Sequence, residues 1–525
     1  MDYLKIGQAG ELKGRDRKLY RAFEILPGIL SWTTLIGLTV LSYFQPIFVA
    51  FFIIAFDVYW LLLVLFLGIH LLVSYYRMKN GLSADWRLLC ENLPVRAIRI
   101  NDARSGQAAE KEMVWTDILH LVIFPFSFEE YEVIAQSLKA ITESGYPLNK
   151  IILVLGAEER AGADGLERAE RARKEFGPLF RNFLVTVHPD GREGEIKGKG
   201  PNQAWAAKEA KARIIDPEGI DQDKILVSVF DIDTVIYKDY FYCLTHRFLT
   251  ADEPHRSSYQ PIPVYHNNLW QAPFFARVAA SSNTFWQMMQ QIRQEKLATY
   301  SSHAMTWRTL NDIGFWSTSM VSEDSRIFWH SFCYYNGDYR VVPLHYPVSM
   351  DVCMDETMFE SARNLYKQQR RWGWGVENVP YLLFNALKNR KTIPKGKFLS
   401  RIFVQVYGFH SWATNALIIG VIGWLPMLLG GDRFNATVLS TNLPVVTRTL
   451  MMIAMSGLIL SAIISTLLLP PRPKNYGAVR NAVMVLQWLI LPVSIIIFGA
   501  VPGLDAQTRL MFGKYLGFWV TPKRR

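Results

Sequence analysis

The sequence predicts an α/β domain with a parallel, Rossmann-like sheet, inserted between membrane-spanning helices. Apolar runs long enough to cross a bilayer lie near both ends of the chain, and the stretch between them alternates strands with helices. The composition agrees, because 50% hydrophobic and 20% charged residues exclude a disordered chain and a protein made only of membrane spans. The net charge of +11 favours anionic partners such as phospholipid, nucleotide or nucleic acid.

Residues 1–80 are predicted to form a basic segment and two transmembrane helices. Only Gln45 and Pro46 separate the apolar runs 27–44 and 47–75, so we expect a helical hairpin. Basic residues flank the pair on both sides: Lys13, Arg15, Arg17, Lys18 and Arg21 before it, and Arg77 and Lys79 after it. By the positive-inside rule, we expect both flanks in the cytoplasm.

Residues 81–380 carry the pattern of the α/β domain. The expected strands cover residues 120–127, 150–157, 182–189 and 224–234, and a helix is expected at 129–145. Strands that alternate with helices favour a parallel sheet, whose ligands bind beyond the carboxyl ends of the strands.

The membrane pattern returns after residue 380. We expect an amphipathic interfacial segment at 381–401, transmembrane helices within 402–503, and an interfacial helix with a tail at 504–525. Three apolar runs fall within 402–503, and three crossings would place the basic C-terminus outside, against the positive-inside rule. We therefore expect one run to be re-entrant, split at a proline such as Pro492, or flat on the membrane.

Asp231 and Asp233 end the hydrophobic strand at 224–234. In an extended segment alternate side chains share a face, so both carboxylates can point at one ligand beyond the sheet edge. Two hard oxygen ligands suit Mg²⁺ or Mn²⁺ held against a diphosphate. The alternative interpretation is a solvated turn.

Ser322, Glu323 and Asp324 form a second acidic motif, roughly ninety residues later. A carboxylate near the metal site could take the proton of an acceptor hydroxyl as that oxygen attacks an anomeric carbon. The alternative interpretation is a helix start, with Ser322 as the N-cap and the acids in the first turn. The two interpretations are compatible.

Three further segments are able to bind a ligand. The segment 368–375 contains two arginines and two tryptophans, which bind phosphate and sugar rings but also anchor helices at a membrane surface. The segment 197–202 is glycine-rich and basic, which suits either a phosphate-binding loop or a solvated one. The tail 518–523, taken alone, is interpreted as a membrane-surface anchor.

In content and order, these motifs resemble the membrane-embedded family 2 glycosyltransferases, which include cellulose, chitin and hyaluronan synthases. The most specific match is a Gln-x-x-Arg-Trp motif: Gln368, Arg371 and Trp372. The tail matches the Phe-x-Val-Thr-x-Lys gating loop of bacterial cellulose synthases at four residues: Phe518, Val520, Thr521 and Lys523. The resemblance implies a GT-A-like fold for the inserted domain and a donor clamp formed by the tail.

The resemblance also implies individual roles. Asp231 would hold the nucleotide and Asp233 the Mg²⁺ or Mn²⁺, while Asp324 would be the catalytic base. Arg371 and Lys523 would meet the diphosphate. Further substrate contacts would come from Gln368, from Trp372 on the acceptor, and from Lys197 and Asn202, which match a Lys-x-x-x-x-Asn element of the nucleotide pocket. Glu158 and Glu159 stand where the family often has an Asp-Asp-Gly-Ser type sequence, and Glu158 or Glu159 is the candidate for contacting the nucleobase.

The expected activity is an inverting, metal-dependent transfer of a sugar from a nucleotide-sugar donor, a UDP-sugar, to a growing polysaccharide. We expect this transfer to be coupled to export through the bilayer, with further subunits as candidate partners for export. The alternatives are transfer to a lipid-linked acceptor, and a non-catalytic membrane sensor or transporter of nucleotide sugars. Positive charge clusters beside the apolar runs, which argues against a nucleic-acid partner. We expect a bacterial inner-membrane protein with its catalytic domain in the cytoplasm.

Overall fold

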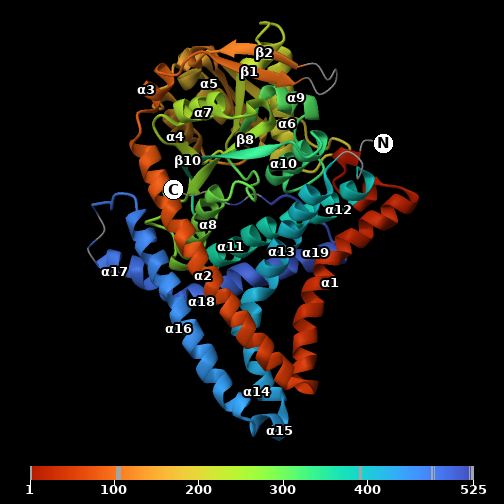
Figure 1. The fold of residues 1–525 in the computed structure, drawn as a ribbon. Coiled ribbons are helices and arrows are strands. Elements are labelled where there is room, and N and C mark those ends of the chain that lie inside the picture. Colours follow the sequence, from red (N-terminus) through yellow and green to blue (C-terminus); the bar gives the residue numbers. More distant parts are fainter. Residues whose placement is uncertain are drawn as a thin grey trace.

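The computed structural model of the protein describes residues 3–101, 108–389, 393–474, 477, 479–519 and 521. An α/β domain stands on a set of long helices that come from both ends of the chain (Figure 1). This arrangement confirms the predicted fold class, a domain inserted between helices able to cross a membrane. Two long helices lead into the domain: α1 (Gly14–Phe44) and α2 (Pro46–Ser83).

The domain is built on an eight-stranded sheet in the order β5-β4-β3-β6-β9-β8-β10-β7. The strands are β3 (Leu119–Phe126), β4 (Ile151–Glu158), β5 (Asn182–His188), β6 (Ile225–Val229), β7 (Val235–Ile236), β8 (Ser257–Val264), β9 (Ala304–Thr306) and β10 (Arg340–Ser349). Strands β5, β4, β3 and β6 are parallel, as predicted. The sheet as a whole is mixed, because β9 runs antiparallel to β6 and β8, and β7 antiparallel to β10. With three and two residues, β9 and β7 are too short to show an alternating pattern in the sequence.

Helices pack on both faces of the sheet. Successive residues of β3 enter different apolar clusters, since Leu121 and Ile123 belong to one and Val122 and Phe124 to the other. The helices of the domain are α3 (Trp86–Glu91), α4 (Tyr131–Thr142), α5 (Gly162–Phe176), α6 (Lys199–Ala210), α7 (Tyr240–Thr250), α8 (Phe274–Ile292), α9 (Trp307–Ile313), α10 (Glu323–Tyr334) and α11 (Met358–Gly373). A separate hairpin comprises β1 (Arg96–Asn101) and β2 (Ala108–Met113). The faces of the sheet are thus covered, which leaves the strand ends for ligands.

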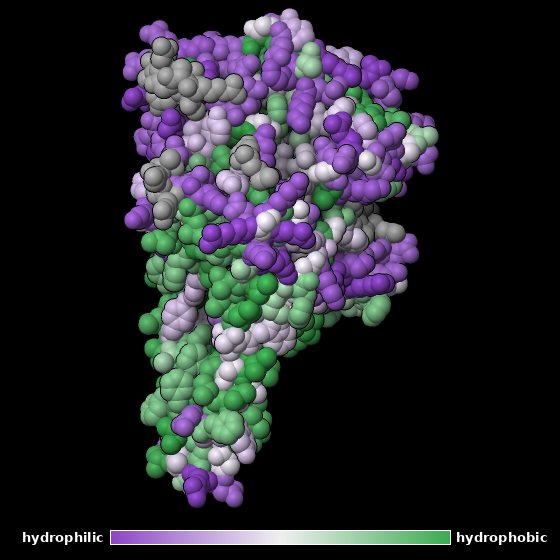
Figure 2. Space-filling model, turned by 90° about the vertical axis from the view of Figure 1, so that its right-hand side faces the viewer, coloured by the Kyte–Doolittle hydropathy of each residue, from purple (hydrophilic) through white to green (hydrophobic). Residues whose placement is uncertain are grey.

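Among the described residues, four helical segments are long and apolar enough to cross a bilayer: α1, α2, α16 (Val438–Leu467) and the segment Asn481–Met511. A pair bent by 41°, Lys395–Gly420 with Ile422–Leu429, would make a fifth. This pair contains α13 (Lys395–Gly420) and α14 (Leu425–Leu429), and the short α15 (Gly431–Asn435) leads on to α16. Figure 2 shows an apolar surface over these helices below the polar surface of the domain.

The last apolar run, Asn481–Met511, is split and lies across the other helices. It contains most of α17 (Val479–Leu486), followed by α18 (Leu491–Ile495) and α19 (Val501–Met511). A 3₁₀ turn at Gln487–Ile490 joins α17 to α18, and a π turn at Ile496–Ala500 joins α18 to α19. In Figure 1 it runs beneath the domain, whereas α2 and α16 run away from it. α19 packs against α1 and α11. The helix type therefore changes next to Pro492, and by length and hydropathy the run is one of the candidate membrane spans.

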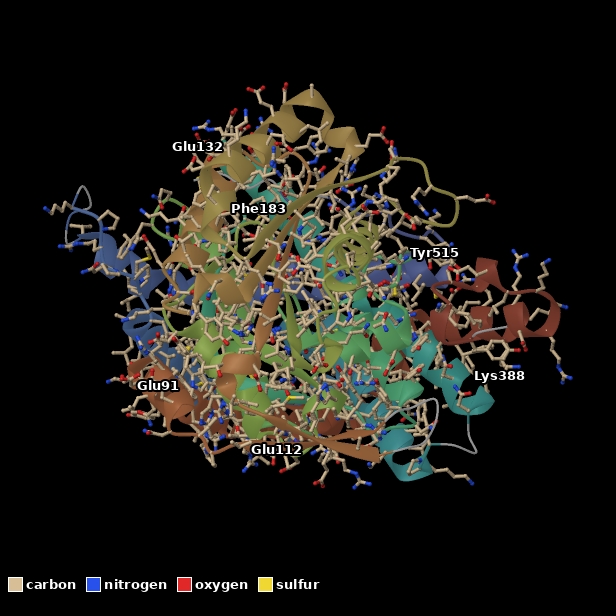
Figure 3. The ribbon with its side chains drawn as sticks, turned by 90° about the horizontal axis from the view of Figure 1, so that it is seen from above. Glu91, Glu112, Glu132, Phe183, Lys388 and Tyr515 are labelled. Carbon is tan, nitrogen blue, oxygen red and sulfur yellow. The ribbon has the colours of Figure 1, made fainter. Side chains whose placement is uncertain are left out.

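Two segments contact the first turns of α1: the end of α12 (Asn378–Lys388) and the stretch after α19. Lys388, at the end of α12, pairs with Asp16 at 2.7 Å. Tyr515 donates its hydroxyl proton to the buried Glu24 carboxylate at 2.8 Å. Figure 3 shows Lys388 and Tyr515 on the same side of the molecule. The predicted interfacial segment 381–401 is thus divided between α12, which is buried against α1, and the start of α13.

Candidate active site

The site lies where the chain leaves β6. Phe230 extends the strand into the core, and a turn follows at once, because the amide of Thr234 donates to the carbonyl of Asp231 at 2.8 Å. This turn replaces the extended segment assumed from the sequence, so the two carboxylates have different surroundings. Asp231 is partly exposed, whereas Asp233 is fully buried and accepts a hydrogen bond from the amide of Asp351 at 2.9 Å.

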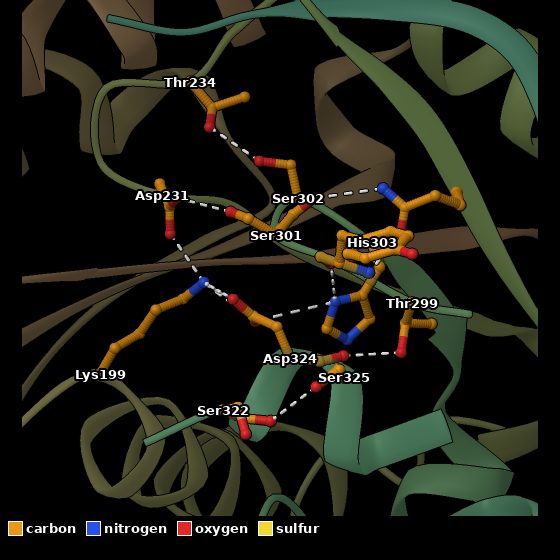
Figure 4. A network of polar contacts seen from close by, with 12 residues as sticks. Lys199, Asp231, Thr234, Thr299, Ser301, Ser302, His303, Ser322, Asp324 and Ser325 are labelled. Carbon is orange, nitrogen blue, oxygen red and sulfur yellow. Dashed lines mark hydrogen bonds and ion pairs between the residues drawn. The ribbon is translucent and has the colours of Figure 1, made fainter. Parts of the chain in front are cut away.

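Lys199 joins the two acidic motifs (Figure 4). Its Nζ lies 2.7 Å from Oδ1 of Asp231, and 3.0 and 2.8 Å from Oδ1 and Oδ2 of Asp324. The lysine is the first residue of α6 and follows Gly198, whose φ of +143° favours glycine. Segments around residues 199, 231 and 324 therefore converge on one point beyond the end of β6.

The loop before β9 contacts both acidic residues, the carboxylate of Asp231 and the backbone of Asp324. Ser301 donates its hydroxyl proton to Oδ2 of Asp231 at 2.5 Å, and Thr299 donates to the backbone carbonyl of Asp324 at 2.6 Å. Nδ1 of His303 donates to the carbonyl of Tyr300 at 2.9 Å and lies 3.9 Å from Oδ1 of Asp324. Burial lowers the pKa of His303 more than the nearby Asp324 raises it, so the ring is neutral near pH 7.

The motif with Asp324 starts α10, but its cap differs from the prediction. Ser322 precedes the helix, yet its hydroxyl makes no bond to the helix amides and donates instead to Glu377 at 2.5 Å. The amide of Ser322 donates to the same Glu377 oxygen at 2.9 Å. Glu377, which comes from beyond the Gln-x-x-Arg-Trp motif, therefore anchors the turn that carries Asp324.

The charges of the site are strongly coupled. Burial by itself would lower the pKa of the Lys199 ammonium, but the charges of Asp231, Asp324 and Glu323 outweigh it and raise the pKa above its usual range. Burial raises the pKa of the Glu323 carboxyl, Asp324 raises it further, and Lys199 and Arg371 act in the opposite direction. Lys199 is therefore a permanent cation in a cluster of acids.

The Gln-x-x-Arg-Trp motif lies on α11, next to the site. The guanidinium of Arg371 lies 4.9 Å from the ring centre of Phe518, so the structure brings this arginine and the tail together. Trp372 packs on a buried apolar cluster that includes Phe275 and Val352, and Phe498 packs on the same cluster. Gln368 is buried within the helix.

The tail lies on the domain side. Phe518 packs on the backbone of Gly198, where an added Cβ would come within 2.4 Å of the ring. Thr521 is buried, at 4% exposure. Val520 and Lys523 lie outside the described residues. Phe518 of the tail therefore contacts Arg371 and also Gly198, the residue before Lys199.

Glu158 and Lys197 line a cavity of about 60 Å³ beyond the ends of β4 and β5. Glu158 is held by Arg160, and Lys197 is exposed and pairs with Asp190 at 2.8 Å. Asn202 is buried and donates to the carbonyl of Gly156 at 2.7 Å, so it ties α6 to the end of β4. Glu158 and Lys197 thus line one cavity and Asn202 lies at the end of β4, whereas Lys199 reaches Asp231 and Asp324.

Lys199, Ser301 and Glu377 were missed as site residues by the sequence analysis. Lys199 falls within the glycine-rich segment 197–202, but spacing alone does not decide which of its two lysines points inward. Ser301 belongs to no recognisable motif. Glu377 follows Trp372 by five residues and carried no signal of its own.

The donors at the end of β6 suit a divalent cation. Within the described residues no group of three or more His, Cys, Asp or Glu side chains is arranged to hold a metal. Mg²⁺ is commonly bound by one or two carboxylates together with substrate phosphates and water. Asp231 and Asp233 provide such hard oxygen donors, so their chemistry fits a metal shared with a diphosphate.

Comparison with known proteins gives one family match. The family described as Glycosyl transferase family group 2 matches residues 226–498, just over half of the chain. No curated protein sequence matches significantly.

Among solved structures, the mannosyltransferase PcManGT from Pyrobaculum calidifontis, in complex with GDP-Man and Mn²⁺, is 14% identical and has a TM-score of 0.43. The match covers 79% of this chain and 98% of that one. S. aureus TarS 1-349 in complex with UDP is 11% identical with a TM-score of 0.35, over 67% of this chain and 91% of that one.

Proposed function

Because the chain belongs to Glycosyl transferase family group 2, and so is a glycosyltransferase, we propose that it transfers a sugar from a UDP-sugar to a growing polysaccharide, with inversion at the anomeric carbon. The observation that carries this proposal is the convergence of Asp231 and Asp324 on Lys199 beyond the end of β6, with Arg371 beside Phe518, which packs on the neighbouring Gly198. Sites of this kind beyond strand ends are where α/β folds bind ligands.

In the proposed reaction, Asp324 takes the proton of the acceptor hydroxyl as that oxygen attacks the anomeric carbon. The bond from this carbon to the diphosphate breaks on the opposite side. Arg371, whose charge acts on the neighbouring Glu323, stabilises the leaving diphosphate, and Trp372 meets the acceptor. Asp231 holds the donor.

Asp233 and Asp231 would hold a Mg²⁺ or Mn²⁺ ion, which neutralises charge on the departing diphosphate when bound. Glu158 and Lys197, which line the cavity beyond β4 and β5, are proposed to contact the nucleotide, and Asn202 and Gln368 to shape the pocket. The tail would close over the donor: Phe518 lies on Gly198 beside Arg371, which supports a clamp formed with Val520, Thr521 and Lys523.

We further propose a bacterial inner-membrane location with the domain in the cytoplasm. The positive residues beside α1 and α2 support this orientation. With α1, α2, the bent pair and α16 as crossings and the final run flat, the tail returns to the domain side, next to Gly198. Export of the polymer, alone or with further subunits, is the version we prefer.

Transfer to a lipid-linked acceptor is the second candidate. Trp372, the proposed acceptor contact, packs on the same buried apolar cluster as Phe498, Ile490 and Leu469, which belong to the apolar C-terminal segments. An acceptor that arrives from the bilayer would reach the site along this surface.

The experiment is radiolabel transfer by purified protein in lipid nanodiscs, with a panel of UDP- and GDP-sugars, followed by sizing of the product. We expect transfer from a UDP-sugar into long chains, and a single added sugar on lipid would select the second candidate. The Asp324→Asn variant should lose all but a small residual rate of transfer and keep donor binding. Equal turnover by this variant would remove Asp324 from its role.

A further inference from the structure

We propose that Lys199 is a positioning residue for the transfer step, and that its ammonium holds the carboxylate of Asp324 against the donor-binding Asp231. This inference rests on the proposed function. Three carboxylate oxygens lie within 3.0 Å of Nζ, two of them from Asp324. Lys199 therefore contacts both oxygens of the proposed base and sets the orientation of that group.

The local backbone is shaped for this lysine. Gly198 adopts a φ of +143°, which delivers Lys199 to the first position of α6. At Gly200, an added Cβ would lie 3.2 Å from the side chain of Glu323 and 3.0 Å from the carbonyl of Ser317. The two glycines thus bring the start of α6 close to the start of α10, and the lysine side chain is 10% exposed between them.

Lys199 provides the positive charge that balances the acidic side chains around it. Glu323, Asp324 and Asp231 all act on the Lys199 ammonium. His303 does not replace it, because burial keeps that ring neutral and its Nδ1 proton is bound to Tyr300. Without Lys199, Asp231 and Asp324 would repel each other in a partly desolvated site, and Asp324 would turn away.

The ammonium is compatible with proton transfer. When the acceptor oxygen bonds to the anomeric carbon, its proton passes to one oxygen of Asp324, and the electron pair of the broken bond leaves with the nucleoside diphosphate. One of the two Lys199 contacts to Asp324 opens for that oxygen. The remaining contacts, to the other Asp324 oxygen and to Asp231, keep the carboxyl group in place.

The test compares Lys199→Met with Lys208→Ala, a loss of the same charge from an exposed position of the same helix. We expect Lys199→Met to lower kcat by about 100-fold or more, within the range for misplaced acid–base groups. The donor Kd from calorimetry should change far less, and Lys208→Ala should match the wild type. In the Asp324→Asn background, Lys199→Met should cause no further loss, because the two residues act as one unit.

Two results would overturn the inference. The first is a Lys199→Met variant that is folded, by its thermal unfolding profile, and as active as the wild type. The second is a loss from Lys199→Met that remains undiminished in the Asp324→Asn background, which would assign the lysine a role separate from Asp324. Failure of the proposed function is visible separately, as absence of transfer by the wild-type protein.

Discussion

The carboxylate of Glu377 accepts two hydrogen bonds from Ser322, one from the amide at 2.9 Å and one from the hydroxyl at 2.5 Å. Trp374 donates its indole proton to the other oxygen of Glu377 at 2.9 Å. Both oxygens of the Glu377 carboxylate thus accept hydrogen bonds. Because Ser322 immediately precedes the turn with Asp324, and Trp374 belongs to the segment 368–375, Glu377 connects the proposed base to that segment.

Replacing Glu377 with alanine should therefore impair catalysis through the position of Asp324. One buried donor, of Trp374, and two partly buried donors, of Ser322, would lose their acceptor, which costs up to about 1–3 kcal/mol for each donor that stays unsatisfied. We expect kcat to fall about 10- to 100-fold, as for groups displaced by about an ångström. Glu377→Gln keeps one acceptor oxygen and should fall between the alanine variant and the wild type. Full activity in Glu377→Ala would show that Asp324 needs no such anchor.

Much of this fold could be predicted because strong patterns carry it. The apolar runs 27–44 and 47–75 predict α1 and α2, and the continuous apolar strands predict the parallel half of the sheet. The rest of the sheet depends on contacts between distant segments. β9 has three residues and is defined only by its partners β6 and β8, so no local pattern could predict it.

The site could be predicted only in part for a related reason. Asp231 could be assigned because it follows a buried strand, and the structure brings Asp324 to it. Lys199 could not be chosen over Lys197, since both sit beside glycines and only the direction of the side chain separates them. The turn at Asp231 depends on one backbone hydrogen bond from Thr234, which a strand pattern does not reveal.

A methyl group at Gly198 should disturb the tail. In Gly198→Ala the Cβ would lie 2.4 Å from Phe518 and the backbone would be strained. We expect the donor KM to rise about tenfold, in line with roughly 1–3 kcal/mol of strain. Gly194→Ala is the control, because that glycine also has a positive φ but no atom within 4 Å of an added Cβ. If Phe518 is the obstacle, Gly198→Ala with Phe518→Ala should recover part of the lost affinity. An unchanged KM in Gly198→Ala would place the tail outside the donor site.

Removal of divalent cations should stop transfer. Treatment with EDTA is expected to lower the rate by about 100-fold or more, with recovery on addition of Mn²⁺ or Mg²⁺, because a metal would neutralise the leaving diphosphate. Asp233→Asn should raise the metal concentration needed for half-maximal rate. Asp216→Asn, which changes an exposed acid paired with Lys211, should leave that concentration unchanged. Full activity in EDTA would mean that Lys199 and Arg371 provide the neutralising charge alone.

Acid should weaken the attachment of the hairpin β1–β2 to the domain. Asp223, with 7% exposure, pairs with Lys111 of β2 and with Arg308 of α9. Burial alone would raise the pKa of Asp223, but its bond to Arg308, with further help from Lys111, lowers the pKa below the usual value.

The sign of the pH effect follows from that lowered pKa. The stabilisation is complete above the unfolded pKa of about 3.9 and is lost as the pH falls through the lower folded value. We expect Asp223→Asn to cost roughly 1.5–3 kcal/mol at pH 7, the range for hydrogen bonds to charged groups. The variant and the wild type should still differ fully at about pH 4 and should converge only as the pH falls further, through the lowered folded pKa of Asp223. Thermal unfolding of the two proteins between neutral and acid pH measures the cost at pH 7 and its loss in acid. A stability difference that stays constant down to the lowest pH would contradict the role given to the ionised Asp223.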